Sequence, residues 1–341
     1  MASDKQDISD KGDSVDAGIL GKGDRKTVKS SDKGVESSLG EMKFGEESEP
    51  MAIDNSSANG TEDRYNMTYA KRGKAVIINN QKFKNLNERK GSDVDREKLK
   101  EMFKKLTFSV KIYNNLTCRE LKDVLKALSE EDHSNSDCLA IAILSHGADN
   151  GDIYGSDDET IPILQVAEYF LGDNCKSLVG KPKLFFIQAC QGTKTDPGVD
   201  QVDAALDESH EPTQRLPVWA DFLICLSTMH GYYAFRNSEK GSWFIQAMDE
   251  VFRRHAESMD LISMMTRVNR KVALEFESNV PRKPGYHKKK QIPCIMSMLT
   301  KEVYFTWKPP VEEVEEEENE ELGEEQMNRA FDIIDQAMSP F

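Results

Sequence analysis

A cysteine and a histidine, each following an apolar run, are the residues of this chain best suited to covalent chemistry. Cys190 follows the run 183–187 and is the centre of the pentapeptide Gln-Ala-Cys-Gln-Gly (188–192). His146 lies 44 positions earlier, just after the run 138–144. Both runs have the composition of buried strands, and open α/β sheets place their active sites at the carboxyl ends of strands. The two side chains are therefore a candidate nucleophile and base.

A cysteine nucleophile needs a base and a set of donors for the tetrahedral oxyanion. Cys190 is the candidate nucleophile, and His146 is the candidate general base and acid. Gly147 follows the histidine directly, and without a Cβ its N–H can approach a substrate oxygen closely. We expect the N–H groups of Gly147 and Cys190 to form the oxyanion hole.

The net charge of −15 is concentrated at the two ends of the chain. Residues 1–54 hold 8 basic and 13 acidic side chains, and residues 309–341 hold 1 basic and 12 acidic ones. The stretch between them is therefore close to neutral. A nucleic-acid-binding face needs a strong excess of Lys and Arg, so we expect no nucleic-acid partner.

The cysteine pattern argues against both a disulfide framework and a metal site. None of the six cysteines forms a Cys-x-x-Cys pair or has a histidine at zinc-ligand spacing. No apolar stretch reaches the length of a membrane span, and residues 1–5 do not begin a signal peptide. We therefore expect reduced thiols in a cytoplasmic protein, with no metal, no cofactor and no membrane contact.

The middle of the chain alternates strand and helix patterns. Strands are predicted at 74–79, 108–113, 138–144, 183–187, 222–226 and 295–305, and helices at about 93–106, 117–129, 163–170, 242–256 and 260–276. Such alternation predicts an α/β fold with a central, mostly parallel sheet flanked by helices on both faces.

Three polar regions surround or interrupt this pattern. Residues 1–62 are rich in Asp, Ser, Lys and Gly and are predicted to form a disordered leader. Residues 191–216 contain four Asp and two Glu without periodicity, which indicates an exposed linker. Residues 309–341 form an acidic tail, in which apolar residues from Met327 to Met338 have the spacing of a short amphipathic helix.

Over residues 64–307 the chain resembles an executioner caspase. The pentapeptide 188–192 fits the signature Gln-Ala-Cys-[Arg/Gln/Gly]-Gly of that family. Further segments match in the family's order: Gly91-Ser92-Asp93-Val94-Asp95, Ser129-Glu130-Glu131-Asp132-His133, Ala220-Asp221-Phe222-Leu223, Gly231-Tyr232-Tyr233, Gly241-Ser242-Trp243-Phe244-Ile245-Gln246 and Lys290-Gln291-Ile292-Pro293-Cys294.

The resemblance implies a caspase-like fold made of a large and a small subunit from one chain, paired as a dimer of such units. The large subunit would span 63–203 including the start of the linker, the rest of the linker 204–216, and the small subunit 217–308. The tail 309–341 has no counterpart in the family pattern. The short leader lacks a helical recruitment module, which favours an executioner over an initiator.

The resemblance also implies an endopeptidase that cuts proteins after Asp in apoptosis. In the family, two Arg and one Gln hold the substrate Asp at P1, and the matching residues are Arg89, Gln188 and Arg236. An Arg fork pairs with a carboxylate in a bidentate manner, so these residue types suit that substrate.

Aromatic residues of the family's S2 and S4 pockets also have counterparts, namely Tyr233, Phe235, Trp243 and Tyr286. Phe235 stands where the family usually has Trp, so we expect a wider S2 pocket. The loop 279–286 lacks the paired Phe beside S4. Its Arg282 and Lys283 would favour an acidic P4 side chain by charge.

Family members are zymogens, and the resemblance implies activation by a cut in the linker 191–216. Asp203 is the favoured site because Asp200-Gln201-Val202-Asp203 offers Asp at P4 and P1 before the small Ala204. Asp54 is the candidate site for removal of the leader.

The implied partners are protein substrates with Asp at P1, an upstream activating caspase, a second copy of the chain in a heterotetramer of cut subunits, and inhibitor-of-apoptosis proteins.

One alternative function is that of a catalytically inactive relative that only binds and regulates partners. The joint presence of Cys190, His146 and the three P1-binding residues argues against it. Another is a protease of the same fold that cuts after Lys or Arg, which would need acidic residues at 89 and 236.

Overall fold

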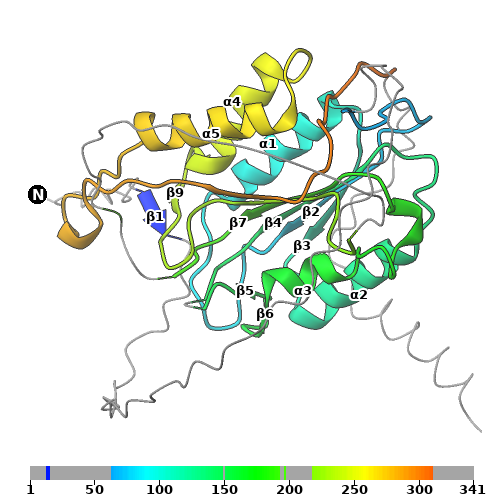
Figure 1. Cartoon of the computed structure of the whole chain (residues 1–341). Helices are drawn as coiled ribbons and strands as arrows, with labels where there is room; N and C mark the ends of the chain where they lie inside the picture. Colours follow the sequence, from blue (N-terminus) through cyan, green and yellow to red (C-terminus); the bar gives the residue numbers. More distant parts are fainter. Residues whose placement is uncertain (1–12, 16–62, 149, 193–195, 197–216, 310–341) are drawn as a thin grey trace, which may run out of the picture.

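The computed structural model describes residues 13–15, 63–148, 150–192, 196 and 217–309 (Figure 1). Its centre is a six-stranded sheet in the order β11-β8-β7-β4-β2-β3. The strands are β2 (Lys74–Asn79), β3 (Ser109–Asn114), β4 (Leu139–Leu144), β7 (Lys183–Gln188), β8 (Phe222–Leu226) and β11 (Cys294–Ser297). All neighbours pair in parallel except β11, which runs antiparallel to β8. The predicted mostly parallel sheet is confirmed.

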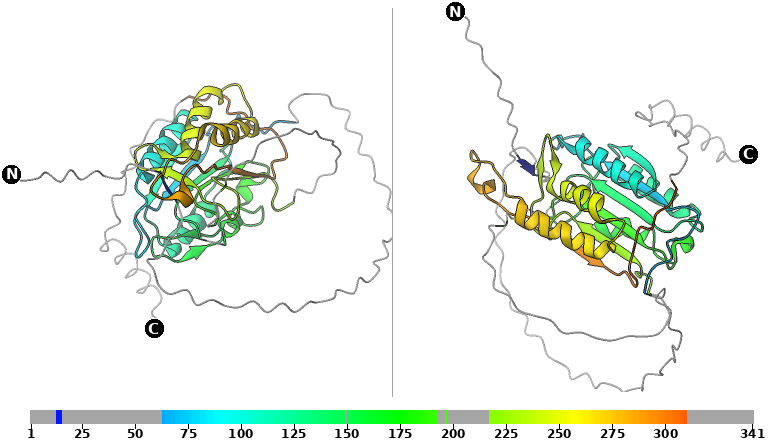
Figure 2. Two further views of the ribbon diagram at one scale, coloured as in Figure 1. Left: turned by 90° about the vertical axis from the view of Figure 1, so that its left-hand side faces the viewer. Right: turned by 90° about the horizontal axis from the view of Figure 1, so that it is seen from above.

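Helices cover both faces of the sheet (Figures 1 and 2). One face carries α1 (Ser92–Lys105), α4 (Trp243–His255) and α5 (Leu261–Glu275), and the other carries α2 (Cys118–Glu130) and α3 (Ile163–Glu168). Within the described residues, no helix combines the length and apolar character needed to cross a membrane.

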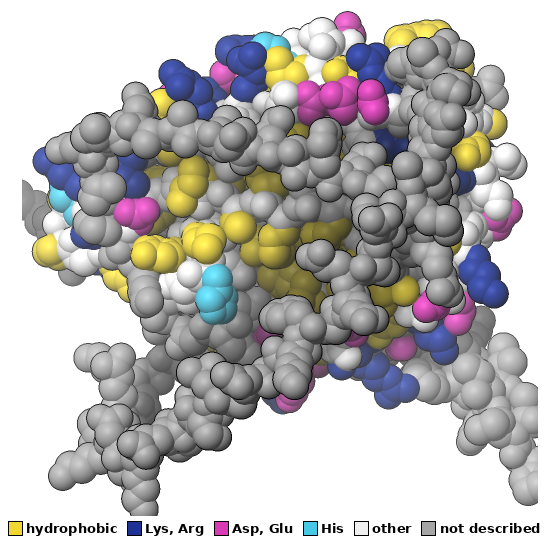
Figure 3. Space-filling view, viewed as in Figure 1, with side chains coloured by type: hydrophobic (Ala, Val, Ile, Leu, Met, Phe, Trp, Pro, Cys, Tyr) yellow, Lys and Arg dark blue, Asp and Glu magenta, His cyan; other side chains and the backbone are white. Residues whose placement is uncertain are grey.

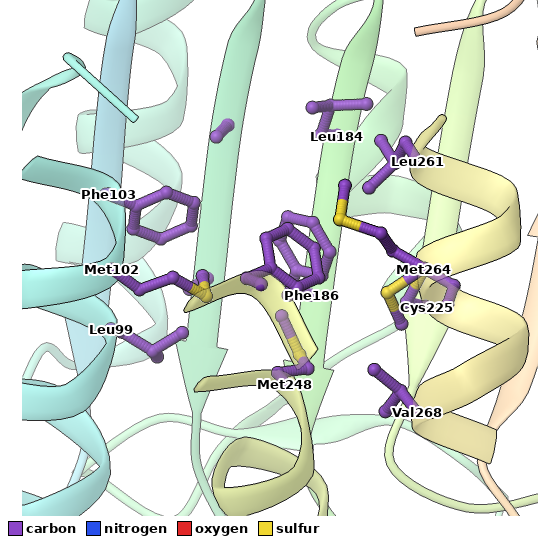
Figure 4. Close-up of a cluster of buried hydrophobic side chains, with 14 of the residues drawn as sticks. Leu99, Met102, Phe103, Leu184, Phe186, Cys225, Met248, Leu261, Met264 and Val268 are labelled. Carbon is purple, nitrogen blue, oxygen red and sulfur yellow. The ribbon is translucent and has the colours of Figure 1, made fainter. Parts of the chain in front are cut away.

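Side-chain alternation along the strands divides the core in two. On β7, Leu184 and Phe186 pack in the cluster under α1, α4 and α5, whereas Phe185 and Ile187 pack in the cluster under α2. Figure 4 shows part of the first cluster, with Phe186 facing side chains from α1, α4 and α5. Because both faces of the strand are buried, its sequence is a continuous apolar run rather than an alternating one.

Local sequence signals set the helix starts. Thr117 accepts a hydrogen bond from the Glu120 N–H at 3.2 Å, and the Glu120 carboxylate accepts from the Thr117 N–H at 2.8 Å. This capping box fixes the start of α2, the helix predicted from about residue 117. The Ser242 side chain accepts from the Ile245 N–H and caps α4, and the Asp260 side chain accepts from the Ser263 N–H and caps α5.

The short elements were not predicted from the sequence, and one predicted strand was too long. Two short antiparallel pairs are β5 (Ile153–Tyr154) with β6 (Thr160–Ile161), and β9 (Phe235–Asn237) with β10 (Gly241–Ser242). The 3-10 turns η1 (Lys176–Leu178) and η2 (Pro284–Tyr286) were also not predicted.

The last predicted strand, 295–305, was wrong beyond residue 297. Val303 and Phe305 have the alternation of a strand, but their side chains are buried in the core cluster under α1, α4 and α5. The Val303 carbonyl accepts a hydrogen bond from the Leu261 N–H. Inside the stretch predicted as leader, the structure describes one strand, β1 (Asp13–Val15), which pairs with β9.

A buried ion pair holds the amino ends of β2 and β4 together. The Arg72 guanidinium lies 2.9 Å from the Asp137 carboxylate, and both side chains are almost fully buried, at 1% and 0% exposure. Arg72 also donates to the Leu106 carbonyl, and Lys308 lies 3.1 Å from the same carboxylate. The pair therefore connects two strands, the end of α1 and the segment after β11.

We expect Asp137→Ala to lower the free energy of unfolding by about 3–5 kcal/mol, because it leaves the Arg72 charge buried without its carboxylate. The double variant Arg72→Leu/Asp137→Leu should lose less, since the fully buried Arg72 charge is removed together with its carboxylate and only the partly exposed Lys308 loses an ion-pair partner. Chemical denaturation in a Cys190→Ala background measures both. Equal losses in the two variants would contradict this account of the pair.

Candidate active site

The ladder between β4 and β7 brings the predicted nucleophile and base to one place. Leu144 pairs with Gln188, so His146 and Cys190 each lie two residues beyond the same rung at the carboxyl edge of the sheet. The two backbones touch there: a Cβ on Gly147 would lie 1.7 Å from the Cys190 carbonyl oxygen. Only glycine fits this approach, and the structure thus brings both predicted oxyanion residues into contact.

A backbone carbonyl orients the histidine. The His146 Nε2 lies 2.7 Å from the Asn87 carbonyl oxygen, and the ring packs against Phe83 with centroids 4.7 Å apart. A carbonyl can only accept, so Nε2 carries the proton and Nδ1 has an available lone pair. Nδ1 is buried and makes no hydrogen bond, which leaves it able to take a proton from a thiol.

The cysteine is covered by the segment 231–234. Cys190 is fully buried, and its sulfur accepts a hydrogen bond from the Ala234 N–H at 3.2 Å. The next residue continues the contact, because the Gln191 N–H donates to the Tyr232 carbonyl at 2.9 Å. Burial raises the pKa of the Cys190 thiol to about 12. Burial therefore favours the protonated form of the thiol in this arrangement.

The three predicted P1-binding residues come from three segments that end at this edge. Arg89 lies in the loop after β2, Gln188 ends β7, and Arg236 lies on β9, and all three are buried. Arg89 donates to the Asn80 carbonyl at 3.2 Å and to the Ser92 hydroxyl at 2.6 Å, and the Arg236 Nε donates to the Lys90 carbonyl at 2.9 Å.

The two guanidinium groups make this region strongly electropositive. Burial lowers the pKa of Arg89 to about 10 and that of Arg236 to about 9. Burial, together with the Arg89 charge, lowers the pKa of His146 to about 4. A carboxylate entering here would compensate buried positive charge, which is the physical requirement of an aspartate pocket.

The predicted pocket aromatics form two pairs. Tyr233 and Tyr286 lie with ring centroids 5.4 Å apart and share a hydrogen bond of 3.2 Å between their hydroxyl groups. Phe235 stacks on Trp243 at 4.7 Å. Tyr233, Phe235 and Trp243 are buried, whereas Tyr286 is partly exposed.

The loop after α5, which contains Tyr286, also carries exposed basic side chains. Arg282, Lys283 and Lys288 of the loop after α5 are exposed. Figure 3 shows Lys and Arg side chains at the left-hand end of the molecule, where Figure 1 places this loop and β1. Among the described residues, no cluster of three or more His, Cys, Asp or Glu side chains has the arrangement of a metal site.

The roles of several supporting residues were not predicted from the sequence. Gln291 accepts a hydrogen bond from the Phe235 N–H at 2.7 Å and donates to the Ser227 carbonyl at 2.6 Å, so it fixes the start of β9. Phe276 stacks on Trp243 at 5.5 Å. Gln291 lay in a segment that matched the family, but its role was not assigned. Asn87 acts through its backbone, which no side-chain pattern reveals.

The predicted processing residues Asp203 and Asp54 lie outside the described residues. Of the linker beyond Gly192 and before Pro217, the structure describes Asp196 alone. Its carbonyl accepts a hydrogen bond from the Lys290 N–H at 3.1 Å.

Comparisons with known proteins agree with this geometry. A family model described as "Caspase domain" matches residues 72–304. Caspase-3 of Bos taurus is 46% identical over 250 residues, covering 72% of this chain and 88% of that protein. Caspase-7 of Gallus gallus is 44% identical over 250 residues, covering 71% and 80%. The crystal structure of caspase-1 from Spodoptera frugiperda matches with a TM-score of 0.67 at 39% identity, covering 76% of this chain and 99% of that one.

The lowered pKa of His146 predicts a pH dependence of stability. The unfolded histidine titrates near 6.5 and the folded one near 4, so its contribution is present above pH 6.5 and is lost as the pH falls towards 4. The full change in the free energy of unfolding from this one group is about 3 kcal/mol.

His146→Asn in the Cys190→Ala chain should therefore reduce the loss of stability between pH 7 and pH 4. Burial raises the pKa of Asp95 to about 6, which acts in the opposite direction, but this group is common to both chains. Denaturation at a series of pH values measures the difference. Parallel curves would contradict a neutral, buried histidine.

Proposed function

Because the chain belongs to the caspase family, as an aspartate-specific cysteine endopeptidase with an executioner role in apoptosis, we propose that Cys190 and His146 form its catalytic pair. The shared rung of β4 and β7 is the observation that carries the proposal. It sets both side chains at one edge of a rigid sheet, with Gly147 against the cysteine backbone.

The proposed reaction begins with transfer of the thiol proton to the His146 Nδ1. The Cys190 sulfur attacks the backbone carbonyl carbon of the P1 aspartate, and the Gly147 and Cys190 N–H groups stabilise the oxyanion. His146 then gives its proton to the leaving amine, and water hydrolyses the thioester. The Asn87 carbonyl stabilises the charged imidazolium formed in between, because it accepts from Nε2.

We assign recognition of the P1 carboxylate to Arg89, Gln188 and Arg236. The two buried cations supply the compensating charge, and the amide supplies a further donor. Tyr233, Phe235, Trp243 and Tyr286 would contact the P2 and P4 side chains once the aromatic pairs separate.

A cut in the linker would open the site. Gln191 and Gly192 begin the linker, and their contacts with residues 231 and 232 hold the covering segment on the cysteine. Cleavage after Asp203 would let these residues move away, exposing the thiol and lowering its pKa. An upstream caspase would make this cut, as part of a zymogen mechanism.

The edge strand β11 supports the proposed dimer. Its outer edge has no neighbour in the six-stranded sheet of the described residues, and native proteins cover or block such edges. We propose that β11 pairs with the same strand of a second copy. We further propose that the substrates are proteins with Asp at P1 and that inhibitor-of-apoptosis proteins regulate the enzyme. We also propose a cytoplasmic location.

Arg236→Gln should lower kcat/KM for a tetrapeptide reporter with Asp at P1 by about 100-fold or more, because a charge-assisted contact to a buried carboxylate is lost. The same variant should discriminate less between Asp and Asn at P1. Arg254→Gln, on the exposed side of α4, is the matched control and should behave as wild type. Unchanged selectivity in Arg236→Gln would remove this residue from the pocket.

Asp203→Ala should keep the linker uncut and lower reporter turnover by at least about 100-fold, because a thiol with a pKa near 12 holds little thiolate at neutral pH. Intact mass measurement shows the cut, and Cys190→Ala gives the background rate. If Cys190 of a linker-cut dimer does not react with an Asp-directed electrophile, the result would favour the alternative of an inactive regulator.

A further inference from the structure

A buried carboxylate on α1 interacts with both sides of the proposed P1 pocket. Asp95 lies in the first turn of α1 and is 0% exposed. Its Oδ1 accepts a hydrogen bond from the Ser242 N–H at 2.8 Å, whereas its Oδ2 is buried and makes no hydrogen bond. Burying a carboxylate with one oxygen unpartnered costs folding free energy, so packing alone does not account for this residue.

The hydrogen bond of Asp95 reaches the hairpin that carries Arg236. Ser242 lies on β10, directly opposite Arg236 in the antiparallel pairing of β10 with β9. The preceding residue is Gly241, with a φ of +87°, and a Cβ there would lie 2.3 Å from the Asp95 Oδ1. Only glycine lets the carboxylate come this close to the hairpin. Asp95 therefore anchors the strand that pairs with Arg236.

A second contact from α1 holds the turn of the same hairpin. The Lys98 ammonium donates a hydrogen bond to the Lys240 carbonyl, between β9 and β10. Within the turn, the Asn237 side chain accepts hydrogen bonds from the Glu239 and Lys240 N–H groups at 2.9 and 3.0 Å. The hairpin is thus ordered in itself and attached to α1 at two points.

The Asp95 carboxylate also interacts with Arg89, which lies in the loop after β2 and precedes α1 by three residues. Burial is the main influence on both groups, since it raises the pKa of Asp95 to about 6 and lowers that of Arg89 to about 10. Each charge partly offsets the effect of burial on the other. The negative charge of Asp95 therefore stabilises a cation that would bind the P1 aspartate.

The balance of buried charge fits this position. Arg89 and Arg236 are both buried, and an ionised Asp95 leaves one of their two positive charges uncompensated. A single P1 carboxylate then neutralises the pocket. An uncharged residue at position 95 would leave two buried cations for one substrate carboxylate, which is unfavourable.

We propose that Asp95 is a positioning residue for substrate recognition, which acts through Ser242 and Arg89 to hold the two pocket arginines at the spacing that distinguishes Asp from Glu at P1. The inference rests on the proposed function, because it takes Arg89 and Arg236 as the groups that bind the P1 carboxylate. Asp95 itself does not contact the substrate. When its hold on the hairpin weakens, Arg236 moves with its strand and a longer acidic side chain is tolerated.

Steady-state kinetics of the linker-cut full chain, with matched tetrapeptide reporters ending in Asp and in Glu, test the assignment. Asp95→Asn keeps the size of the side chain and an oxygen for the Ser242 N–H but removes the charge. It should lower kcat/KM for the Asp reporter by about tenfold or more, mainly through KM, and reduce the preference for Asp over Glu by a similar factor. Asp93→Asn, in the same turn of α1 but half-exposed, is the matched control and should behave as wild type.

The pH profile of kcat/KM gives a readout that a loss of folded protein would not change. Among the described residues, Arg89 and Lys98 are the charged groups that act directly on Asp95, and Arg253 of α4 acts on Lys98. Asp95 loses its charge as the pH falls through about 6, so wild-type kcat/KM should decrease there. Asp95→Asn should lack this decrease. Lys98→Met removes a cation that lowers the Asp95 pKa, so it should move the decrease to higher pH.

The outcomes separate this inference from the proposed function. A folded Asp95→Asn enzyme with the KM, Asp preference and pH profile of wild type would overturn the inference. If Asp95→Asn does not fold, the half-exposed Lys98→Met decides, and an unshifted profile with unchanged preference would overturn it. Loss of the Asp preference in Arg236→Gln alone would leave the proposed function intact. An unchanged preference in both Arg236→Gln and Arg89→Gln would overturn the proposed function and this inference together.

Discussion

The hydrogen bond from the Ala234 N–H to the Cys190 sulfur links the two functions of the site. Cys190 lies two residues beyond β7, and Ala234 immediately precedes the strand β9 that carries Arg236. One contact therefore joins the proposed nucleophile to the strand that would bind substrate. While it holds, the thiol is buried and its pKa is raised, so the same contact covers the proposed nucleophile and favours its protonated form.

Buried charge is the second feature on which the site depends. Arg89 and Arg236 are held by carbonyl and hydroxyl oxygens of the chain rather than exposed to water, and their burial lowers their pKa values. Keeping two cations in this position costs folding free energy. The cost is consistent with a site preorganised for a carboxylate, because an entering aspartate replaces lost hydration with charge-assisted hydrogen bonds.

The strand β9 connects recognition with regulation. Its start is fixed by the Gln291 amide, its second residue is Arg236, and its open edge receives β1. A strand that accepts an extended peptide by backbone pairing will accept any segment whose side chains fit, and specificity then comes from the pockets.

The sequence alone determined the elements whose signals are local. Apolar runs and helical spacing located the main strands and helices, and the pentapeptide around Cys190 indicated a cysteine endopeptidase. Only the tertiary structure decided which groups complete the site: the Asn87 carbonyl, the Gln291 amide, the Ala234 N–H and the pairing of β1 with β9. These contacts join residues far apart in the chain or act through the backbone, so side-chain patterns do not encode them. For the same reason Val303 and Phe305 looked like a strand, because alternation shows which residues are buried but not what they are buried against.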